Sequence, residues 1–380
     1  MSATGRPGAD APDASDVATR LRDAGFVRLV AGASGDAVAA AGLLASALGS
    51  LDVPYQSSVV PLPEPADRAT DDDVTVALGR PSADADLTVG TGSTPASRTA
   101  FDVASRLAVP DAELALAGTC AAGVHPGEEL LAAGSERGIE RRPGVGIPTS
   151  NPVAGLAHST LVHAAFSGSV EDAADAIGRL DVPDALADDD WRRVASLVAF
   201  TVTEEGTPRG ATRVEGFLRP LASPGSRFET VEGYGDVLDA VAHERPGLAV
   251  PLALGALERE TALDAWRRHA SRAHEAVRAA SAGRYDGLFV ARCGADAPLG
   301  TVARLVRDYR SPEPLVLVVT DGAACVAATD DSPAASHHVG SMVAEAATSV
   351  GGDGTGTATR ARARFDVEPT EFVVALREVL

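Results

Sequence analysis

The sequence predicts an α/β fold with two domains, and three observations support this. The chain has 380 residues, about twice the usual length of one domain. In its first third, short apolar strand patterns alternate with helical ones, which is typical of a parallel sheet built from βαβ units. The same alternation returns after about residue 250. We therefore expect two sheets, each packed against its own helices.

The first sheet is expected between Val17 and Ala122. Apolar runs predict its strands, and Ala-rich or periodic stretches predict the helices between them. Strands or extended segments are predicted at 27–30, 55–61, 74–79 and 85–89, and helices at 37–48, 95–107 and 111–120. Residues 1–16 lack the pattern of a signal peptide and are predicted to form a short disordered arm.

The middle of the chain is predicted to be helical, and a second α/β region closes it. Helices are predicted at 153–180 (broken at 167–169), 188–202 and 256–283, with a loop-rich stretch at 209–227. The closing region has predicted strands at 285–291, 314–320, 323–329 and 360–364, and helices at 299–309, 336–349 and 368–380. Glycines at 351–356 predict a loop. The 256–283 helix has a basic face, but its interleaved acids are more typical of a solvated linker.

The charged residues exclude several reaction classes. The sequence contains no lysine, so all 33 basic residues are arginine, and the formal net charge is −20. A Walker-A lysine, a Schiff-base lysine and a kinase-type strand lysine are therefore excluded. An acidic chain without lysine and with Ala/Val-rich cores is typical of a halophilic archaeal cytoplasmic protein, whose salt screens the self-repulsion.

Cysteines and apolar runs exclude other classes. Cys120, Cys293 and Cys325 are far apart, which supports neither a zinc ribbon nor a disulfide framework. No apolar run approaches the ~20 residues that cross a bilayer. We expect no membrane association and a cytoplasmic location.

The turn after the first strand is the first candidate site. Gly32–Asp36 follows the strand 27–30, and the carboxyl ends of strands are where α/β proteins usually hold ligands. Asp36 is the one side chain in this turn that could carry acid–base or metal chemistry. The alternative is that Asp36 caps the helix that follows, as Asp commonly does.

The segment Val30–Ala41 resembles the first motif of the DHH phosphoesterase superfamily, specifically its archaeal RecJ-like branch. That motif reads His-x-Asp-x-Asp-Gly-x-x-Ala-Ala, and its His and Asp residues hold catalytic manganese. The resemblance places the histidine at Ala31 and the two aspartates at Ala33 and Gly35. It therefore implies a degenerate metal site with Asp36 as a possible remnant.

The later motifs of the family are degenerate in the same way. Ala77 stands where the second motif has its aspartate, and the strand 86–89 runs into Gly90-Thr91-Gly92 instead of Asp-His-His. The helix Leu114–Ala122 lacks the aspartate of the fourth motif. A two-metal phosphoesterase needs several such ligands, so the resemblance implies that no catalytic residue is intact and that no metal is bound.

The resemblance also implies an arrangement of domains. It predicts a DHH-type parallel sheet domain and a smaller α/β domain similar to DHHA1, joined by a helical linker. The predicted bounds are 1–16 for the arm, 17–185 for the DHH-like domain, 186–283 for the linker region and 284–380 for the DHHA1-like, nucleic-acid-binding domain.

The second candidate site lies in that last domain. In the family, a glycine-rich loop there grips the nucleic-acid backbone, and Gly351, Gly352, Gly354 and Gly356 stand at the matching place. Glycines let backbone amides approach a phosphate, and the alternative is a flexible loop without a ligand. The neighbouring arginines alternate along a predicted strand, so they share one face that suits a phosphodiester backbone: Arg360, Arg362 and Arg364. The alternative is an edge strand kept soluble by arginine.

These observations predict a RecJ-like protein of DNA replication or repair that has lost its nuclease centre. By resemblance it would bind single-stranded DNA and replisome partners of the GINS type. The rival interpretation is an active manganese-dependent single-strand exonuclease or nucleotide phosphoesterase that uses Asp36, Asp84 and Asp86. A third class, a small-molecule enzyme at the same turn, would bind a nucleotide without affinity for DNA.

Overall fold

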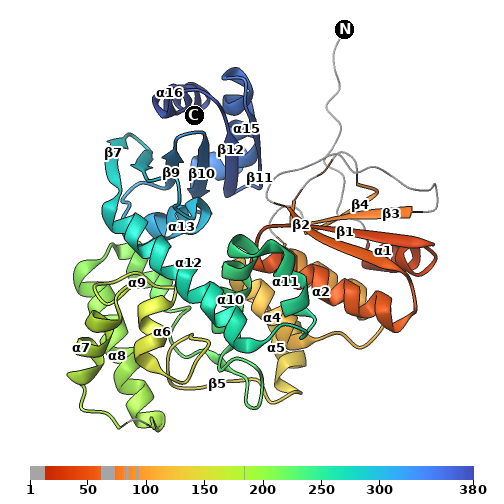
Figure 1. The fold of residues 1–380 in the computed structure, drawn as a ribbon, viewed down its shortest axis with the longest axis horizontal. Coiled ribbons are helices and arrows are strands. Elements are labelled where there is room, and N and C mark those ends of the chain that lie inside the picture. Colours follow the sequence, from red (N-terminus) through yellow and green to blue (C-terminus); the bar gives the residue numbers. More distant parts are fainter. Residues whose placement is uncertain (1–12, 61–72, 81, 83–84, 91–93, 184) are drawn as a thin grey trace.

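The computed structural model describes residues 13–60, 73–80, 82, 85–90, 94–183 and 185–380. These residues form two α/β halves connected by a long helix (Figure 1). The predicted disordered arm lies outside the described residues up to position 12, while helix α1 (Ala14–Arg22) begins within its last three positions. Among the described residues, no helix has both the length and the apolar character needed to cross a membrane.

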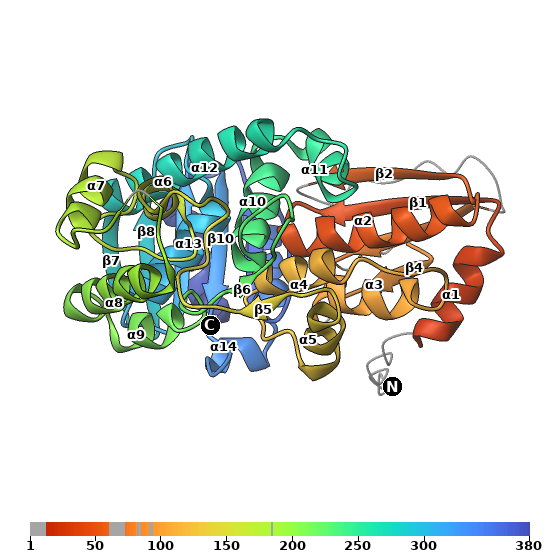
Figure 2. The ribbon, with the colours of Figure 1, turned by 90° about the horizontal axis from the view of Figure 1, so that it is seen from below.

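The first sheet is parallel, as predicted. Its four strands are β1 (Phe26–Gly32), β2 (Tyr55–Val60), β3 (Asp73–Leu78) and β4 (Leu87–Val89), in the order β2-β1-β3-β4. Helices α2 (Gly35–Ser50) and α3 (Ala96–Ala104) lie against one face of it, and α4 (Ala112–Ala121) packs on these two helices (Figure 2). The alternate residues of β1 that face these helices are fully buried, which explains why the strand pattern was visible in the sequence.

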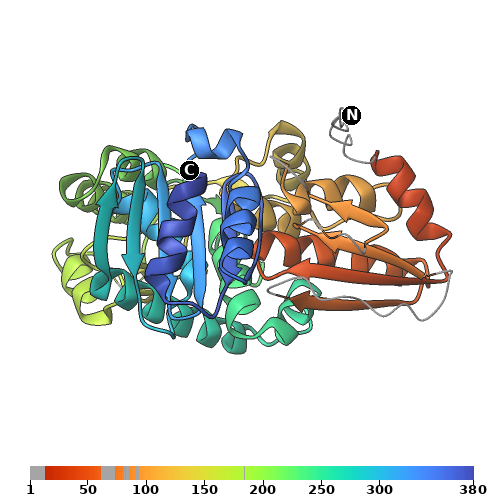
Figure 3. The same ribbon diagram turned by 90° about the horizontal axis from the view of Figure 1, so that it is seen from above.

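The second sheet is mixed. Its order is β11-β12-β10-β9-β8-β7, and only the β8–β9 pair is parallel. The strands are β7 (Ser281–Tyr285), β8 (Leu288–Arg292), β9 (Leu315–Thr320), β10 (Ala323–Ala328), β11 (Asp353–Gly356) and β12 (Arg360–Arg364). Helix α13 (Leu299–Tyr309) packs on one face. Helices α15 (Val339–Ser349) and α16 (Pro369–Val379) cover the other (Figure 3).

The middle of the chain is mainly helical. Its helices are α5 (Glu128–Ser135), α6 (Pro152–His158), α7 (Val170–Gly178), α8 (Asp188–Glu205), α9 (Pro208–Val214), α10 (Val231–Glu244), α11 (Pro246–Ala253) and α12 (Arg259–Ala279). A two-stranded sheet pairs β5 (Glu140–Arg141) with β6 (Leu221–Ala222), and the short helix α14 (Pro333–Ser336) precedes α15.

Three apolar cores hold these elements together. The first joins the parallel sheet and its helices to α10, α11 and the start of α12. The second joins α6 to α9 with α13 and one face of the mixed sheet, and the third fills the opposite face under α15 and α16. The division into four segments stays a prediction. Packing places α6 and α7, from the predicted DHH-like segment, with the second sheet rather than the first.

Three local predictions are wrong, each for a physical reason. Residues 353–356 form the strand β11 rather than a loop, because their backbone pairs with β12. The long helix ends at Ala279 rather than at 283, because the chain enters β7 at Ser281. The stretch 209–227 contains helix α9, which Thr207 caps by accepting a hydrogen bond from the amide of Gly210.

Candidate nucleic-acid interface

In the turn between β1 and α2, backbone amides at the start of the helix donate hydrogen bonds to side-chain oxygens. Ser34 is the N-cap of α2, and its hydroxyl accepts a hydrogen bond from the amide of Ala37 at 3.3 Å. The amide of Gly35 donates to Asp239 Oδ1 of α10 at 2.9 Å. The start of α2 is thus capped from two directions, which satisfies donors that a helix N-terminus otherwise leaves open.

Gly35 has no room for a side chain. A Cβ atom at this position would lie 2.8 Å from the Cβ of Ala121, 2.9 Å from the amide nitrogen of Asp239 and 3.1 Å from the carbonyl oxygen of Gly235. Real Cβ atoms do not approach backbone so closely, so helices α4 and α10 occupy the space that a ligand aspartate would need. The packing at Gly35 does not fit the metal centre that the family implies.

The other degenerate positions are buried among apolar groups. Ala31 is 0% exposed, Ala33 6% and Ala77 1%. Their side chains offer no ligand atoms, and Ala31 belongs to the apolar core between the first sheet and its helices. Thr91 and Gly92, which the resemblance aligns with the Asp-His-His motif, lie outside the described residues.

Sequence reasoning missed Arg80, a buried cation at the same edge of the sheet. Arg80 follows β3 after the turn at Gly79, is 7% exposed, and its Cδ lies 3.7 Å from the Cβ that Gly32 would carry. The arginine stem therefore crosses the carboxyl ends of β1 and β3. Its position directly after a buried strand could have identified it in the sequence.

Asp36 is a helix cap, though not of the predicted helix. Its two carboxylate oxygens accept hydrogen bonds from the amides of Ala96 and Ser97, both at 2.8 Å, at the start of α3. Pro95, the N-cap residue of α3, makes no side-chain cap of its own. Burial raises the pKa of Asp36, while these hydrogen bonds and the charge of Arg360 oppose the rise. Both oxygens serve α3, which leaves Asp36 poorly suited to hold a metal ion.

Of the carboxylates that the rival interpretation uses, Asp36 and Asp86 are described and lie at opposite edges of the first sheet. Asp86 Oδ2 accepts a hydrogen bond from the amide of Thr75 at 2.9 Å, near the amino ends of β3 and β4. Asp36 lies at the carboxyl end of β1, across the sheet, and Asp84 lies outside the described residues. Over the part of the chain that the structure describes, no three His, Cys, Asp or Glu residues are grouped to hold a metal ion.

The arginines of β12 share one face, as their spacing predicted. Ala361 and Ala363 point into the core under α15 and α16, so the arginines point to the opposite face. Arg360 is partly buried, and its Nη2 donates to the carbonyl oxygen of Ala122 at 2.9 Å, which ties β12 to the end of α4. Burial, reinforced by Arg307 and Arg304 of α13, lowers the pKa of Arg360 to about 10.

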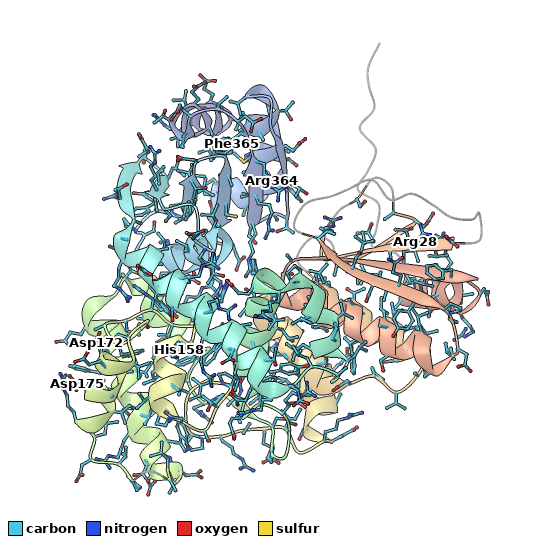
Figure 4. All side chains as sticks on the ribbon, in the orientation of Figure 1. Arg28, His158, Asp172, Asp175, Arg364 and Phe365 are labelled. Carbon is cyan, nitrogen blue, oxygen red and sulfur yellow. The ribbon has the colours of Figure 1, made fainter. Side chains whose placement is uncertain are left out.

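Exposure increases along this arginine row. Arg362 is partly buried and contributes, after burial and His269, to a lowered pKa of His243 on α10. Arg364, at the other end of the strand, is exposed and pairs across the ladder with exposed Asp353 (Figure 4). The row therefore runs from the contact with the first half of the chain out to solvent.

The glycines beside the row are explained by packing. Cβ atoms at Gly352, Gly354 and Gly356 would lie 2.1 Å from the carbonyl oxygen of Arg364, 2.8 Å from that of Val343 and 2.3 Å from that of Arg360. These glycines let β11 lie close to both β12 and α15. Gly351 ends α15 with a φ of 77°, the left-handed conformation that favours glycine. Phosphate binding by this segment stays a prediction.

Sequence comparison with known proteins shows the family of the chain. It is 51% identical, over 383 residues that cover 100% of both chains, to a Haloarcula marismortui protein described as "Uncharacterized protein rrnAC1427". The chain belongs to this protein's family. Residues 280–378 match the family described as the C-terminal domain of rrnAC1427, which overlaps the predicted DHHA1-like segment.

Solved structures identify the fold. CDC45 from Entamoeba histolytica superposes with a TM-score of 0.59 at 9% identity, covering 96% of this chain and 98% of that one. Exonuclease RecJ bound to manganese gives a TM-score of 0.48 at 14% identity, covering 97% and 94%. The superposition on CDC45 confirms the predicted α/β fold class over nearly the whole chain.

Proposed function

We propose that this protein is a nuclease-dead, RecJ-like protein that binds single-stranded DNA in replication or repair. The observation that carries the proposal is the arginine row of β12, which begins at the contact between the two halves of the chain and runs out to solvent. Three cations on one strand face are notable in a chain with a net charge of −20. Guanidinium groups bind phosphates through paired hydrogen bonds, so such a row suits a phosphodiester backbone.

The loss of nuclease activity is proposed from the packing of the turn. Gly35 has no space for a ligand side chain, Asp36 caps α3, and Arg80 crosses the neighbouring strand ends. In each case the residues at the turn stabilise the fold and supply no metal ligand. The absence of a bound metal ion or other cofactor is part of this proposal.

Binding of a fluorescent single-stranded oligonucleotide tests the nucleic-acid interface. Arg362→Ala should weaken binding several-fold. The slope of log affinity against log salt concentration should become shallower by about 0.7 for each phosphate that Arg362 neutralises. Arg179→Ala is the matched control, because Arg179 is an exposed arginine at the end of α7, on the far side of the second sheet's helices. Equal affinities of wild type, Arg362→Ala and Arg179→Ala would contradict the proposed interface.

A cleavage assay with manganese distinguishes the proposed nuclease-dead protein from the active exonuclease of the rival interpretation. The wild-type protein should not cleave single-stranded DNA with manganese, over a range of salt concentrations. Cleavage that Asp36→Ala abolishes, while Asp175→Ala leaves it intact, would establish the rival interpretation. Asp175 is an exposed aspartate of α7 (Figure 4) and serves as the control for loss of a carboxylate.

The proposed partners come from the resemblance, which implies a GINS-type protein. Co-purification from the native host, with and without nuclease treatment, tests this part separately. A replisome protein that remains bound after nuclease treatment supports a direct contact. Nucleotide binding without DNA affinity would favour the small-molecule class instead.

A further inference from the structure

A separate cavity of about 260 Å³ lies along the later turns of α2, away from the turn at Gly35. Its walls come from α2, α4, α10 and the end of α11, together with the loop that precedes α4. Polar groups supply more than half of the accessible lining, and Leu43, Leu114 and Leu252 add buried apolar side chains to it. Val109 and Leu254 at its rim are 86% and 40% exposed. The cavity is smaller than those that hold drug-sized ligands, so it suits a compact molecule.

One polar side chain in this cavity lacks a partner. Tyr234 is 8% exposed, and its ring stacks on Phe228 with centroids 4.9 Å apart. Among the residues that the structure describes, its hydroxyl group makes no hydrogen bond. The hydroxyl group opens into the cavity rather than into the core, so water or a ligand atom in the cavity serves as its partner.

The charges around this hydroxyl are mainly negative. Burial raises the pKa of Tyr234, and the nearby carboxylates of Asp111 and Glu113 raise it further, while Arg227 opposes them more weakly. Arg227 donates to the carbonyl oxygens of Leu257 and Gly255, at 2.8 and 2.5 Å, so its guanidinium is already engaged. The cavity is thus lined by two carboxylates and one arginine, and the guanidinium of that arginine already donates to backbone carbonyl oxygens.

Glu113 is positioned to accept a further donor. Its Oε2 accepts a hydrogen bond from the hydroxyl of Ser226 at 2.8 Å, which fixes the carboxylate at the edge of the cavity. Asp111 caps α4 by accepting from the amides of Glu113 and Leu114. Glu113 and Tyr234 therefore form the recognition end of the cavity, and the leucines form the apolar end.

We propose that this cavity binds a small organic cation, a primary amine on a short apolar stem. The ammonium donates to the hydroxyl oxygen of Tyr234 and to the carboxylate of Glu113, and the stem lies between the leucines. This site is independent of the arginine row, which binds the opposite charge. Failure of either proposal leaves the other standing.

Titration calorimetry with three probes of equal length tests the site: n-butylammonium, n-butanol and n-butyrate. The ammonium should bind saturably, the alcohol more weakly and the carboxylate not at all. Tyr234→Phe and Glu113→Gln should each weaken ammonium binding at least about fivefold, near 1 kcal/mol. Glu129→Gln is the control, because the Glu129 side chain is 90% exposed on α5.

Three results would overturn the proposal: no saturable ammonium binding up to about 10 mM, roughly the weakest affinity worth resolving; equal binding of butyrate; or unchanged affinity in both variants. If Tyr234→Phe or Glu113→Gln fails to fold, Ser46→Phe still tests whether the cavity binds the ammonium. Ser46 is an exposed lining residue of α2, so this substitution narrows the cavity from the surface and should abolish binding.

Discussion

The turn at Gly35 and the arginine row of β12 both lie where the two halves of the chain meet, yet they are built in opposite ways. At the turn, helices pack so closely that no side chain fits at position 35, and the carboxylates of Asp36 and Asp239 accept hydrogen bonds from amides at helix starts. Along β12, charged side chains accumulate and become more exposed from Arg360 to Arg364. The contrast teaches that one junction of a fold can combine a tightly packed turn with an open row of charged side chains.

Placing a ligand aspartate at the turn should have the largest effect. Gly35→Asp should lower the free energy of unfolding by about 4 kcal/mol, because the new side chain overlaps α4 and α10 and its charge faces Asp239. Urea unfolding measures this loss. Gly178→Ala, where nothing lies within 4 Å, is the control and should change stability little. A stable Gly35→Asp protein would break the contrast between a packed and an open site.

A buried carboxyl on α10 should make the packed region sensitive to pH. Burial raises the pKa of Glu232 to about 7 from its usual 4.5, although its oxygens accept from the amide of Leu221 at 2.9 and 3.2 Å. Between these pH values the folded state holds a proton that the unfolded chain releases. The free energy of unfolding should therefore fall by up to about 3 kcal/mol as the pH rises from 4.5 to 7. This decline should flatten in Glu232→Gln, measured by urea unfolding across that range, and an unchanged slope would contradict the assignment.

Removing the long-range cap should have a moderate effect. Asp36→Ala deprives the start of α3 of two hydrogen bonds and should cost about 1 to 2 kcal/mol of unfolding free energy. Affinity for single-stranded DNA should change little, because Asp36 is partly buried and both its carboxylate oxygens already accept hydrogen bonds from α3. The exposed Asp175→Ala variant should match wild type in both measurements. Loss of DNA affinity in Asp36→Ala alone would move the interface toward the turn.

The smallest effect should come from the outer end of the arginine row. Asp353 lies directly across the ladder from Arg364 and offsets part of its charge. Asp353→Asn should therefore strengthen binding of single-stranded DNA about twofold at low salt, and the gain should vanish at high salt. Fluorescence anisotropy at two salt concentrations measures both. Weaker binding in this variant would show that the phosphates follow another path.

The spacing of apolar residues in the sequence predicted those helices and strands whose structure depends mainly on residues close together in the chain. Helix α13 has the predicted bounds 299–309, because its apolar residues recur at helical spacing against a flat sheet. Helix α10 received no prediction. Its apolar residues also repeat at helical spacing after the N-cap Thr230, but Gly233 and Gly235 weaken the helical pattern.

The candidate site was harder to predict because its residues act at long range. The partners of Asp36 lie 60 and 61 residues away, so the sequence indicated a cap but not which helix it serves. The glycines of β11 predicted a loop because glycine is common in loops. Their actual cause, close approach to a strand and a helix, exists only in the folded chain.

The contact between Gly35 and Gly235 has a consequence for any substitution at position 35. A side chain there requires α10 to move away from α2, and α10 is held by the hydrogen bond from Gly35 to Asp239, by the first core and by α12. One substitution at the turn therefore disturbs several helix contacts at once. A larger residue at position 35 would be accepted only together with a compensating change on α10.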